Sequence, residues 1–212
     1  MRIAQYPRNV DAGHATGVTF LISMNSEQRT ANSVLTRETI LHALNSLSNK
    51  LGQQNLIGEI CLFGGTAMML AFTARLTTKD VDAIFQPAQT IRELAHSIAA
   101  DQHLPTDWLN DGVKGFLSTK HKTMEGNLPQ FAYLRLTMPV PEYLLAMKCM
   151  ASRIGYTHGE PSDVADICFL IRHLNLNSAQ GVLALVAQYY PANRISVKTQ
   201  YLIEGLFEEG KI

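Results

Sequence analysis

Two aspartates separated by one residue, Asp80 and Asp82, are the side chains best placed to do chemistry. They lie in segment 80–85, where polar and apolar residues alternate as they do in a half-buried strand. Side chains two apart on a strand face the same side, with Cα atoms roughly 7 Å apart, so both carboxylates can reach one divalent cation. Such hard oxygen ligands favour Mg²⁺ or Mn²⁺. The alternative is a pair of solvated acids on an exposed strand face.

A glycine pair, Gly64 and Gly65, lies between the short apolar segment 60–63 and the small, apolar segment 66–72. This order predicts a strand, a tight turn and a helix. The glycines would let the backbone approach a ligand closely, and the amides that open the helix, with the Thr66 hydroxyl, suit phosphate oxygens. A turn without a ligand is the alternative interpretation.

Basic residues accompany these motifs. Arg75 and Lys79 precede the aspartates and could neutralise phosphates there, and Lys114, close to two glycines, could reach a substrate. Charged residues in loops are most often simply solvated, so that alternative stays open for all three.

Two charged residues occur within apolar helical patterns near the C-terminus. Lys148 lies in the segment Leu-Leu-Ala-Met-Lys-Cys-Met-Ala, and Asp166 lies between Ala165 and Ile167. A charge in such surroundings needs an acidic or phosphate partner. An ion pair between Lys148 and Asp166, which would join two helices, is the structural alternative to a functional role. Asp163 is expected in a first helical turn, where it complements the helix dipole.

Strands and helices must position these residues. Thr36 is expected to cap a helix that ends near Gly52, and after the strand-turn-helix unit and the 80–85 strand, a further helix follows around residues 91–98. Residues 108–116 are expected to be irregular, and residues 131–138 are expected to form a third strand. The remainder is expected to be helical, in the segments 143–153, 163–174, 179–190 and 196–209, with caps at Ser162, Ser178 and Ser196 and Pro141 in a first turn.

These elements predict an α+β fold, a small mixed β-sheet with helices packed around it and a helical C-terminal half. Three parts are expected: a poorly defined N-terminal extension (1–35), an α/β core (36–140) and a helical portion packed on that core (141–212). Within the extension, residues 18–22 could form a short strand, and Met24 is a hypothetical alternative translation start.

Composition excludes several classes of protein. The chain has 212 residues, 46% of them hydrophobic and 17% charged, with a formal net charge of +0, so no global charge recruits nucleic acid or an anionic membrane. Its three cysteines are far apart, which argues against zinc and a disulfide framework. No long apolar run or signal-peptide pattern occurs, so a cytoplasmic protein without membrane contact is expected.

The ordered motifs resemble the signature of the nucleotidyltransferase superfamily, whose members share a DNA polymerase beta-like core. Gly64-Gly65 is followed, fifteen residues after Gly65, by Asp80-Val81-Asp82. The chain is most similar to small bacterial nucleotidyltransferases of unassigned function, related to abortive-infection toxins of toxin-antitoxin systems. The resemblance covers about residues 36–176 and extends through 108–116, 144–148 with Arg153, and 163–170.

This resemblance implies transfer of a nucleoside monophosphate from a nucleoside triphosphate, such as ATP, to a hydroxyl of RNA, protein or a small molecule, with pyrophosphate leaving. Asp80 and Asp82 would bind Mg²⁺ or Mn²⁺, segment 64–66 would bind the triphosphate, Lys148 would contact phosphate and Asp166 would have a supporting catalytic role. A tRNA or protein acceptor and a cognate antitoxin are the partners that the resemblance implies.

One departure from the superfamily pattern bears on activity. Many members carry a third carboxylate on a later strand, but residues 131–138 contain Arg135 and no acid. Glu142 or Asp166 could then serve as the general base. The alternative function is a catalytically inactive binding or regulatory module that keeps the fold.

Overall fold

The computed structural model describes residues 34–152 and 163–212. Several expectations concern residues outside these ranges: the strand at 18–22, the start at Met24, the contribution of Arg153 and the cap at Ser162.

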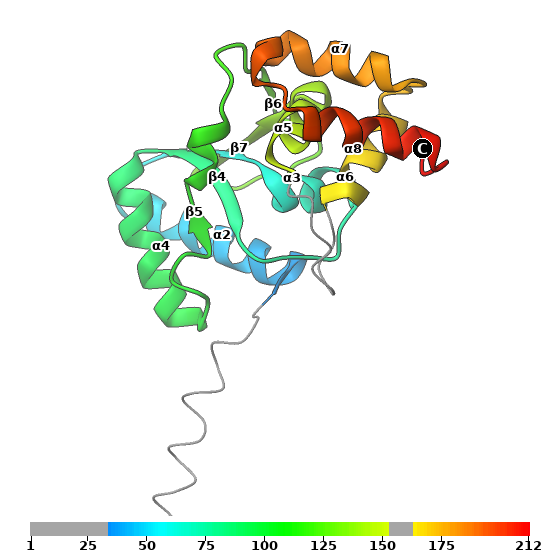
Figure 1. The fold of residues 1–212 in the computed structure, drawn as a ribbon. Coiled ribbons are helices and arrows are strands. Elements are labelled where there is room, and N and C mark those ends of the chain that lie inside the picture. Colours follow the sequence, from blue (N-terminus) through cyan, green and yellow to red (C-terminus); the bar gives the residue numbers. More distant parts are fainter. Residues whose placement is uncertain (1–33, 153–162) are drawn as a thin grey trace, which may run out of the picture. The chain divides into compact units, whose positions relative to one another are not determined.

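A five-stranded mixed sheet forms the centre of the described chain (Figure 1). In order across the sheet, its strands are β5 (Leu109–Asn110), β4 (Val81–Gln86), β2 (Gly58–Leu62), β7 (Leu134–Pro139) and β6 (Thr123–Met124). β4 pairs antiparallel with β2 and parallel with β5, while β7 pairs parallel with β2 and antiparallel with β6. A separate antiparallel pair joins β1 (Leu35–Thr36) to β3 (Thr77–Thr78).

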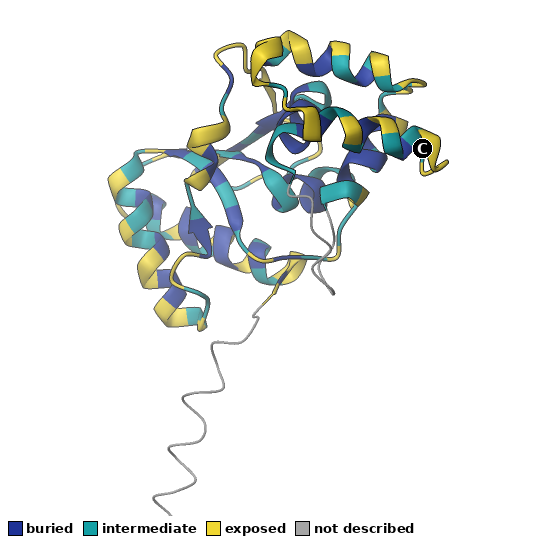
Figure 2. Cartoon of the chain, in the orientation of Figure 1, coloured by how far each residue is buried: buried dark blue, intermediate teal, exposed yellow. Residues whose placement is uncertain are grey.

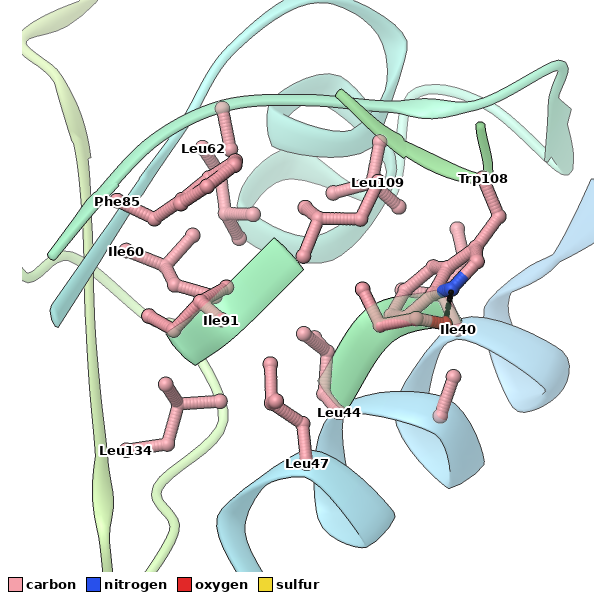
Figure 3. Close-up of a cluster of buried hydrophobic side chains, with 14 of the residues drawn as sticks. Ile40, Leu44, Leu47, Ile60, Leu62, Phe85, Ile91, Trp108, Leu109 and Leu134 are labelled. Carbon is pink, nitrogen blue, oxygen red and sulfur yellow. Dashed lines mark hydrogen bonds between the residues drawn. The ribbon is translucent and has the colours of Figure 1, made fainter. Parts of the chain in front are cut away.

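Two helices, α2 (Arg37–Gln53) and α4 (Ala88–Gln102), cover one face of the sheet. Their apolar residues pack against alternate strand residues, and Figure 3 shows part of this cluster around Trp108. The indole of Trp108 is fully buried and donates a hydrogen bond from Nε1 to the carbonyl of Ala95, at 3.0 Å. The residues of this first core cluster on the strands include Ile60, Leu62, Val81, Ala83, Phe85, Leu134 and Leu136.

The other face packs against the remaining helices through a second core cluster. Cys61, Phe63 and Ile84, which alternate with residues of the first cluster, belong to this side. The helices are α3 (Gly64–Phe72), α5 (Pro141–Ala151), α6 (Asp163–His173), α7 (Ala179–Tyr189) and α8 (Val197–Glu208), with 3₁₀ turns η1 (Gly112–Phe116) and η2 (Ala192–Arg194). Figure 2 shows buried residues in the strands between the helices and exposed ones along the outer sides of α4 and α7.

The predicted α+β fold class is confirmed, with helices on both faces of a small mixed sheet. The caps at Thr36, Ser178 and Ser196 are confirmed as well, since each hydroxyl accepts a hydrogen bond from a backbone amide in the first turn. Pro141 opens α5 as predicted.

Some elements differ from the prediction. The segment read as irregular contains β5 and η1, and the third predicted strand starts at Leu134 rather than at residue 131. The strands that were missed contain two residues each, too few for a period-two pattern to stand out, so only pairing with distant strands defines them. Among the helices of the described residues, none combines the length and the apolar character needed to cross a membrane.

The buried indole provides a test of the first core cluster. We expect Trp108→Ala to lower the free energy of unfolding by about 3–5 kcal/mol, because it leaves a cavity in the core and removes the indole hydrogen bond to Ala95. Urea unfolding followed by circular dichroism measures this, since the variant lacks the chain's single tryptophan. Tyr201→Ala, at a side chain 70% exposed, is the control and should change stability by about 0.5 kcal/mol or less. Equal effects of the two substitutions would contradict the assignment of Trp108 to the core.

Candidate active site

The glycine pair lies where β2 gives way to α3. Gly64 has a φ of +56°, a left-handed conformation that L side chains rarely adopt. A Cβ on Gly64 would lie 2.7 Å from Oδ2 of Asp82, and a Cβ on Gly65 would lie 2.5 Å from the hydroxyl oxygen of Thr78. The close approach that the glycines permit is therefore to the protein's own polar side chains.

The Thr66 hydroxyl is fully buried and donates a hydrogen bond to the backbone carbonyl of Asp80, at 3.0 Å. Its one proton is used within the protein, although we expected this hydroxyl to contact phosphate. In the structure it links the first turn of α3 to the chain that enters β4, and so it positions Asp80.

Both aspartates lie on the face of β4 opposite the first core cluster. Asp80 comes directly before the strand and Asp82 is its second residue, while the alternating residues Val81 and Ala83 are fully buried. Ile84, next along the aspartate face, packs against the second cluster. The two carboxylates are therefore half-buried beside α3 and the C-terminal helices.

Burial makes ionisation of both carboxyls less favourable, and nearby negative charges add to this effect. The pKa of Asp80 is raised from its ordinary value of 3.8 to about 6, first by desolvation and then by the negative charges of Asp82 and Asp107. Desolvation also raises the pKa of Asp82, although the positive charge of Lys148 opposes this effect. Within the described residues neither carboxylate forms an ion pair at 4.0 Å or less.

Lys148 and Asp166 form the ion pair that was the structural alternative for these residues. Asp166 is 2% exposed, and its two oxygens contact different cations: Oδ1 is 2.7 Å from Nε of Arg75, and Oδ2 is 2.7 Å from Nζ of Lys148. Lys148 also contacts Oδ1 of Asp163 at 2.8 Å. Asp163 thus lies in the first turn of α6, as expected, but also pairs with a cation of α5. We refer to Arg75, Lys148, Asp163 and Asp166 as the ion cluster.

The ion cluster adjoins the glycine pair and the aspartates. Nη1 of Arg75 lies 3.1 Å from where a Cβ of Gly65 would be, and the charges of Lys148 and Asp163 both act on Asp82. Nη2 of Arg75 is buried and has no hydrogen-bond partner among the described residues, the nearest carboxylate oxygen, of Asp163, being 3.9 Å away. Arg75 and Lys148 therefore place two fixed cations beside the start of α3.

The structure does not favour the two residues suggested as a general base. Both oxygens of Asp166 lie 2.7 Å from cations, although Oδ2 makes no hydrogen bond of good geometry to the described residues, and the two positive charges oppose uptake of a further proton. Glu142 lies in the first turn of α5, near Tyr189, whose pKa is raised first by desolvation and then by the negative charge of Glu142.

Two of the predicted basic residues lie apart from the ion cluster. Lys79 is exposed and precedes Asp80, where its positive charge partly opposes the desolvation that raises the pKa of Asp80. Lys114, on η1, pairs with Asp111, which Arg92 also contacts at 2.6 Å. The other eight predicted site residues are brought together by the steric contacts, hydrogen bonds, ion pairs and charge effects described above. They are Gly64, Gly65, Thr66, Arg75, Asp80, Asp82, Lys148 and Asp166.

Asn110 is the site residue that sequence reasoning missed. Its Nδ2 donates to Oδ2 of Asp80 at 3.0 Å, and in the parallel pairing of β5 with β4 it lies opposite Asp82. Asn110 lies in segment 108–116, through which the family resemblance extends, but nothing in the sequence singles it out beyond a polar amide directly after the apolar pair Trp108-Leu109. The third carboxylate was sought on β7, but the neighbours of β4 are β2 and β5.

The donors present suit a partial coordination shell for a divalent cation. Two carboxylates supply hard oxygens, and a bound cation would relieve the repulsion and desolvation that raise their pKa values. In residues 34–152 and 163–212, no group of three or more His, Cys, Asp or Glu side chains could hold a metal ion. Mg²⁺ commonly keeps waters and substrate phosphates as its other ligands, which fits a site of this kind.

Comparisons of the chain with protein-family models, with curated proteins and with solved structures found no match. The function must therefore be inferred from the geometry of the site.

The contact between Gly64 and Asp82 gives one prediction. We expect Gly64→Ala to cost about 1–3 kcal/mol of folding stability, because alanine disfavours the left-handed backbone and its Cβ would displace the Asp82 carboxylate. Chemical unfolding measures the loss. Gly205→Ala on α8, where a Cβ meets open space, is the matched control and should be neutral or stabilising. A Gly64→Ala protein as stable as the wild type would contradict the contact.

The raised pKa of Asp80 gives a second prediction. The cost of ionising Asp80 in the folded chain is absent below pH 3.8, where the carboxyl is protonated in both states, and it grows until about pH 6. Asp80→Asn removes that cost and can still accept the Asn110 hydrogen bond. We therefore expect it to stabilise the metal-free protein by about 1 kcal/mol at pH 8, after discounting for residual solvent exposure.

The measurement is thermal unfolding of both proteins between pH 4 and pH 8, in chelator. The stabilisation should shrink towards zero as the pH falls to 4. Asp101→Asn, which removes an exposed carboxylate on α4, is the control and should give no such pH-dependent gain. A stabilisation by Asp80→Asn that is constant over this range would contradict the electrostatic cause.

Proposed function

We propose that the protein is a metal-dependent nucleotidyltransferase, which transfers a nucleoside monophosphate from a nucleoside triphosphate to a hydroxyl. The observation that carries the proposal is the half-buried carboxylate pair Asp80 and Asp82, held against the Gly64-Gly65 turn at the start of α3 without a cation paired to either acid in the described chain. A structural pair of acids would be expected to have basic partners, because unneutralised buried charge costs stability.

The start of α3 supports phosphate binding. Its first amides have no partner in the preceding turn, and the helix dipole favours negative charge there. Arg75 adds a buried guanidinium beside Gly65, with one nitrogen that makes no hydrogen bond to the described residues. The helix amides and the Arg75 guanidinium would orient a bound triphosphate. They would also offset the repulsion between its negative charge and the two aspartates.

A bound Mg²⁺ or Mn²⁺ would neutralise charge on the phosphates and on the pyrophosphate leaving group. Asp80 and Asp82 would hold that cation, and Asn110 and the Thr66 hydroxyl would keep Asp80 in place. Lys148, fixed by Asp163 and Asp166, would supply positive charge beside Asp82.

The second candidate is a binding module that holds a metal-nucleotide without catalysing transfer. Two observations favour it. An amide rather than a carboxylate lies beside the aspartates on the neighbouring strand, and Asp166 is paired through both oxygens.

Labelled-nucleotide transfer separates the two candidates. The full chain is incubated with each α-labelled nucleoside triphosphate and Mg²⁺ or Mn²⁺, together with total RNA and cell protein. Asp80→Asn, Asp82→Asn and the control Asp101→Asn are run in parallel. We expect transfer by the wild type and by Asp101→Asn, and a loss of about 100-fold or more in each site variant.

The labelled product identifies the acceptor as RNA, protein or a small molecule, and a tRNA product would support a toxin role with a cognate antitoxin. Transfer at the wild-type rate by folded Asp80→Asn would refute the proposed site. If no label is transferred but metal and nucleotide together raise the melting temperature only when both acids are present, the binding module is the function.

A further inference from the structure

Asn110 is the residue that the fold brings to the aspartates from a neighbouring strand. β5 and β4 pair in parallel, with Leu109 opposite Val81 and Asn110 opposite Asp82. The backbone amide of Val81 donates to the carbonyl of Trp108 at 2.6 Å, which secures β5 at this edge of the sheet. The position of Asn110 is therefore set by backbone pairing.

Contacts at both ends determine the orientation of the Asn110 side chain. Its Oδ1 accepts a hydrogen bond from the backbone amide of Gly112 at 3.0 Å, and its Nδ2 donates to Oδ2 of Asp80 at 3.0 Å. The reversed orientation would set Nδ2 against an amide and Oδ1 against a carboxylate, so one orientation alone satisfies both partners. In the strand pairing Asn110 also lies opposite Asp82, so the amide adjoins both aspartates.

The chemistry of an amide differs from that of the two alternatives at this position. A carboxylate would add a third negative charge, and a lysine or arginine would neutralise one of the two negative charges. The amide restrains the Asp80 carboxylate and leaves the pair with two negative charges, which one divalent cation balances. Binding of two adjacent cations would leave positive charge that the described donors do not offset.

We propose that Asn110 is a positioning residue that orients Asp80 and limits the site to one divalent cation in the absence of nucleotide. This inference rests on the metal dependence of the proposed function. Through Asn110, η1 is coupled to the metal site, because Gly112 at the start of η1 holds the amide oxygen.

The test measures Mn²⁺ binding to the full chain by electron paramagnetic resonance, without nucleotide, and the melting temperature in chelator. The variants are Asn110→Ala, Asn110→Asp and Asp82→Asn, and the control is Asn193→Ala at an exposed position on η2. We expect one Mn²⁺ per wild-type chain, lost in Asp82→Asn and unchanged in Asn193→Ala. Asn110→Ala should bind Mn²⁺ about ten-fold more weakly, as is typical when a residue that orients a metal ligand is removed.

Asn110→Asp is the variant that a purely structural role cannot explain. It keeps an acceptor for Gly112 but replaces the donor to Asp80 with a negative charge. We expect it to melt at a lower temperature than the wild type in chelator, and to bind Mn²⁺ more tightly or to bind a second ion. A structural role alone predicts the lower melting temperature with wild-type affinity and stoichiometry.

The outcomes separate this inference from the proposed function. Wild-type Mn²⁺ affinity in both Asn110 variants, with binding still lost in Asp82→Asn, would overturn the role of Asn110 and leave the metal site standing. Two ions per wild-type chain would overturn the limit to one cation. No Mn²⁺ binding by the wild type, or binding that Asp82→Asn does not change, would overturn both.

Discussion

The contact between the bare Cα of Gly64 and the Asp82 carboxylate is the constraint on which the site depends. A side chain at Gly64 would lie 2.7 Å from Oδ2 of Asp82, and one at Gly65 would collide with the Thr78 hydroxyl. With no side chains there, the start of α3 can meet both β3 and β4 closely. The hydrogen bond from Thr66 to the Asp80 carbonyl then becomes short enough to form. The glycine pair thus brings a helix N-terminus and two carboxylates together.

The cations of the site are distributed unevenly between its carboxylates, and this uneven distribution lowers folding stability. Both buried cations, Arg75 and Lys148, contact the carboxylates of α6, whereas Asp80 and Asp82 have only a neutral amide and longer-range attraction. The α6 carboxylates therefore have cationic partners within the fold, whereas desolvation raises the pKa of both β4 carboxyls. Local departures from optimal stability of this kind are typical of functional sites.

Sequence patterns predicted those helices and strands whose conformation is determined by residues close to one another in the chain. The helix after Thr36, with its cap and helical spacing of leucines, and the alternation in β4 could be inferred because neighbours in sequence determine them. β5 could not be inferred, because two residues carry no period and their pairing depends on a strand almost thirty residues earlier. Without β5, a third carboxylate was sought only in the predicted strand 131–138, and Asn110 was overlooked. In the structure those residues belong largely to β7, where Arg135 pairs with Glu59 of β2 on an exposed surface.

The contacts of Lys148 in the ion cluster are compatible with both a structural and a functional role. Its ammonium group is 2.7 Å from Asp166, which links α5 to α6, yet its charge also acts on Asp82.

Buried ion pairs add little net stability compared with apolar residues of similar volume, because desolvation offsets their attraction. Stability alone therefore gives no reason to place two cations and two acids among these apolar helices. What the cluster does provide is two cations held in place by carboxylates of the protein, with Arg75 directly beside the glycine pair that opens α3. Such preorganised charge is what recognition of a polyphosphate requires.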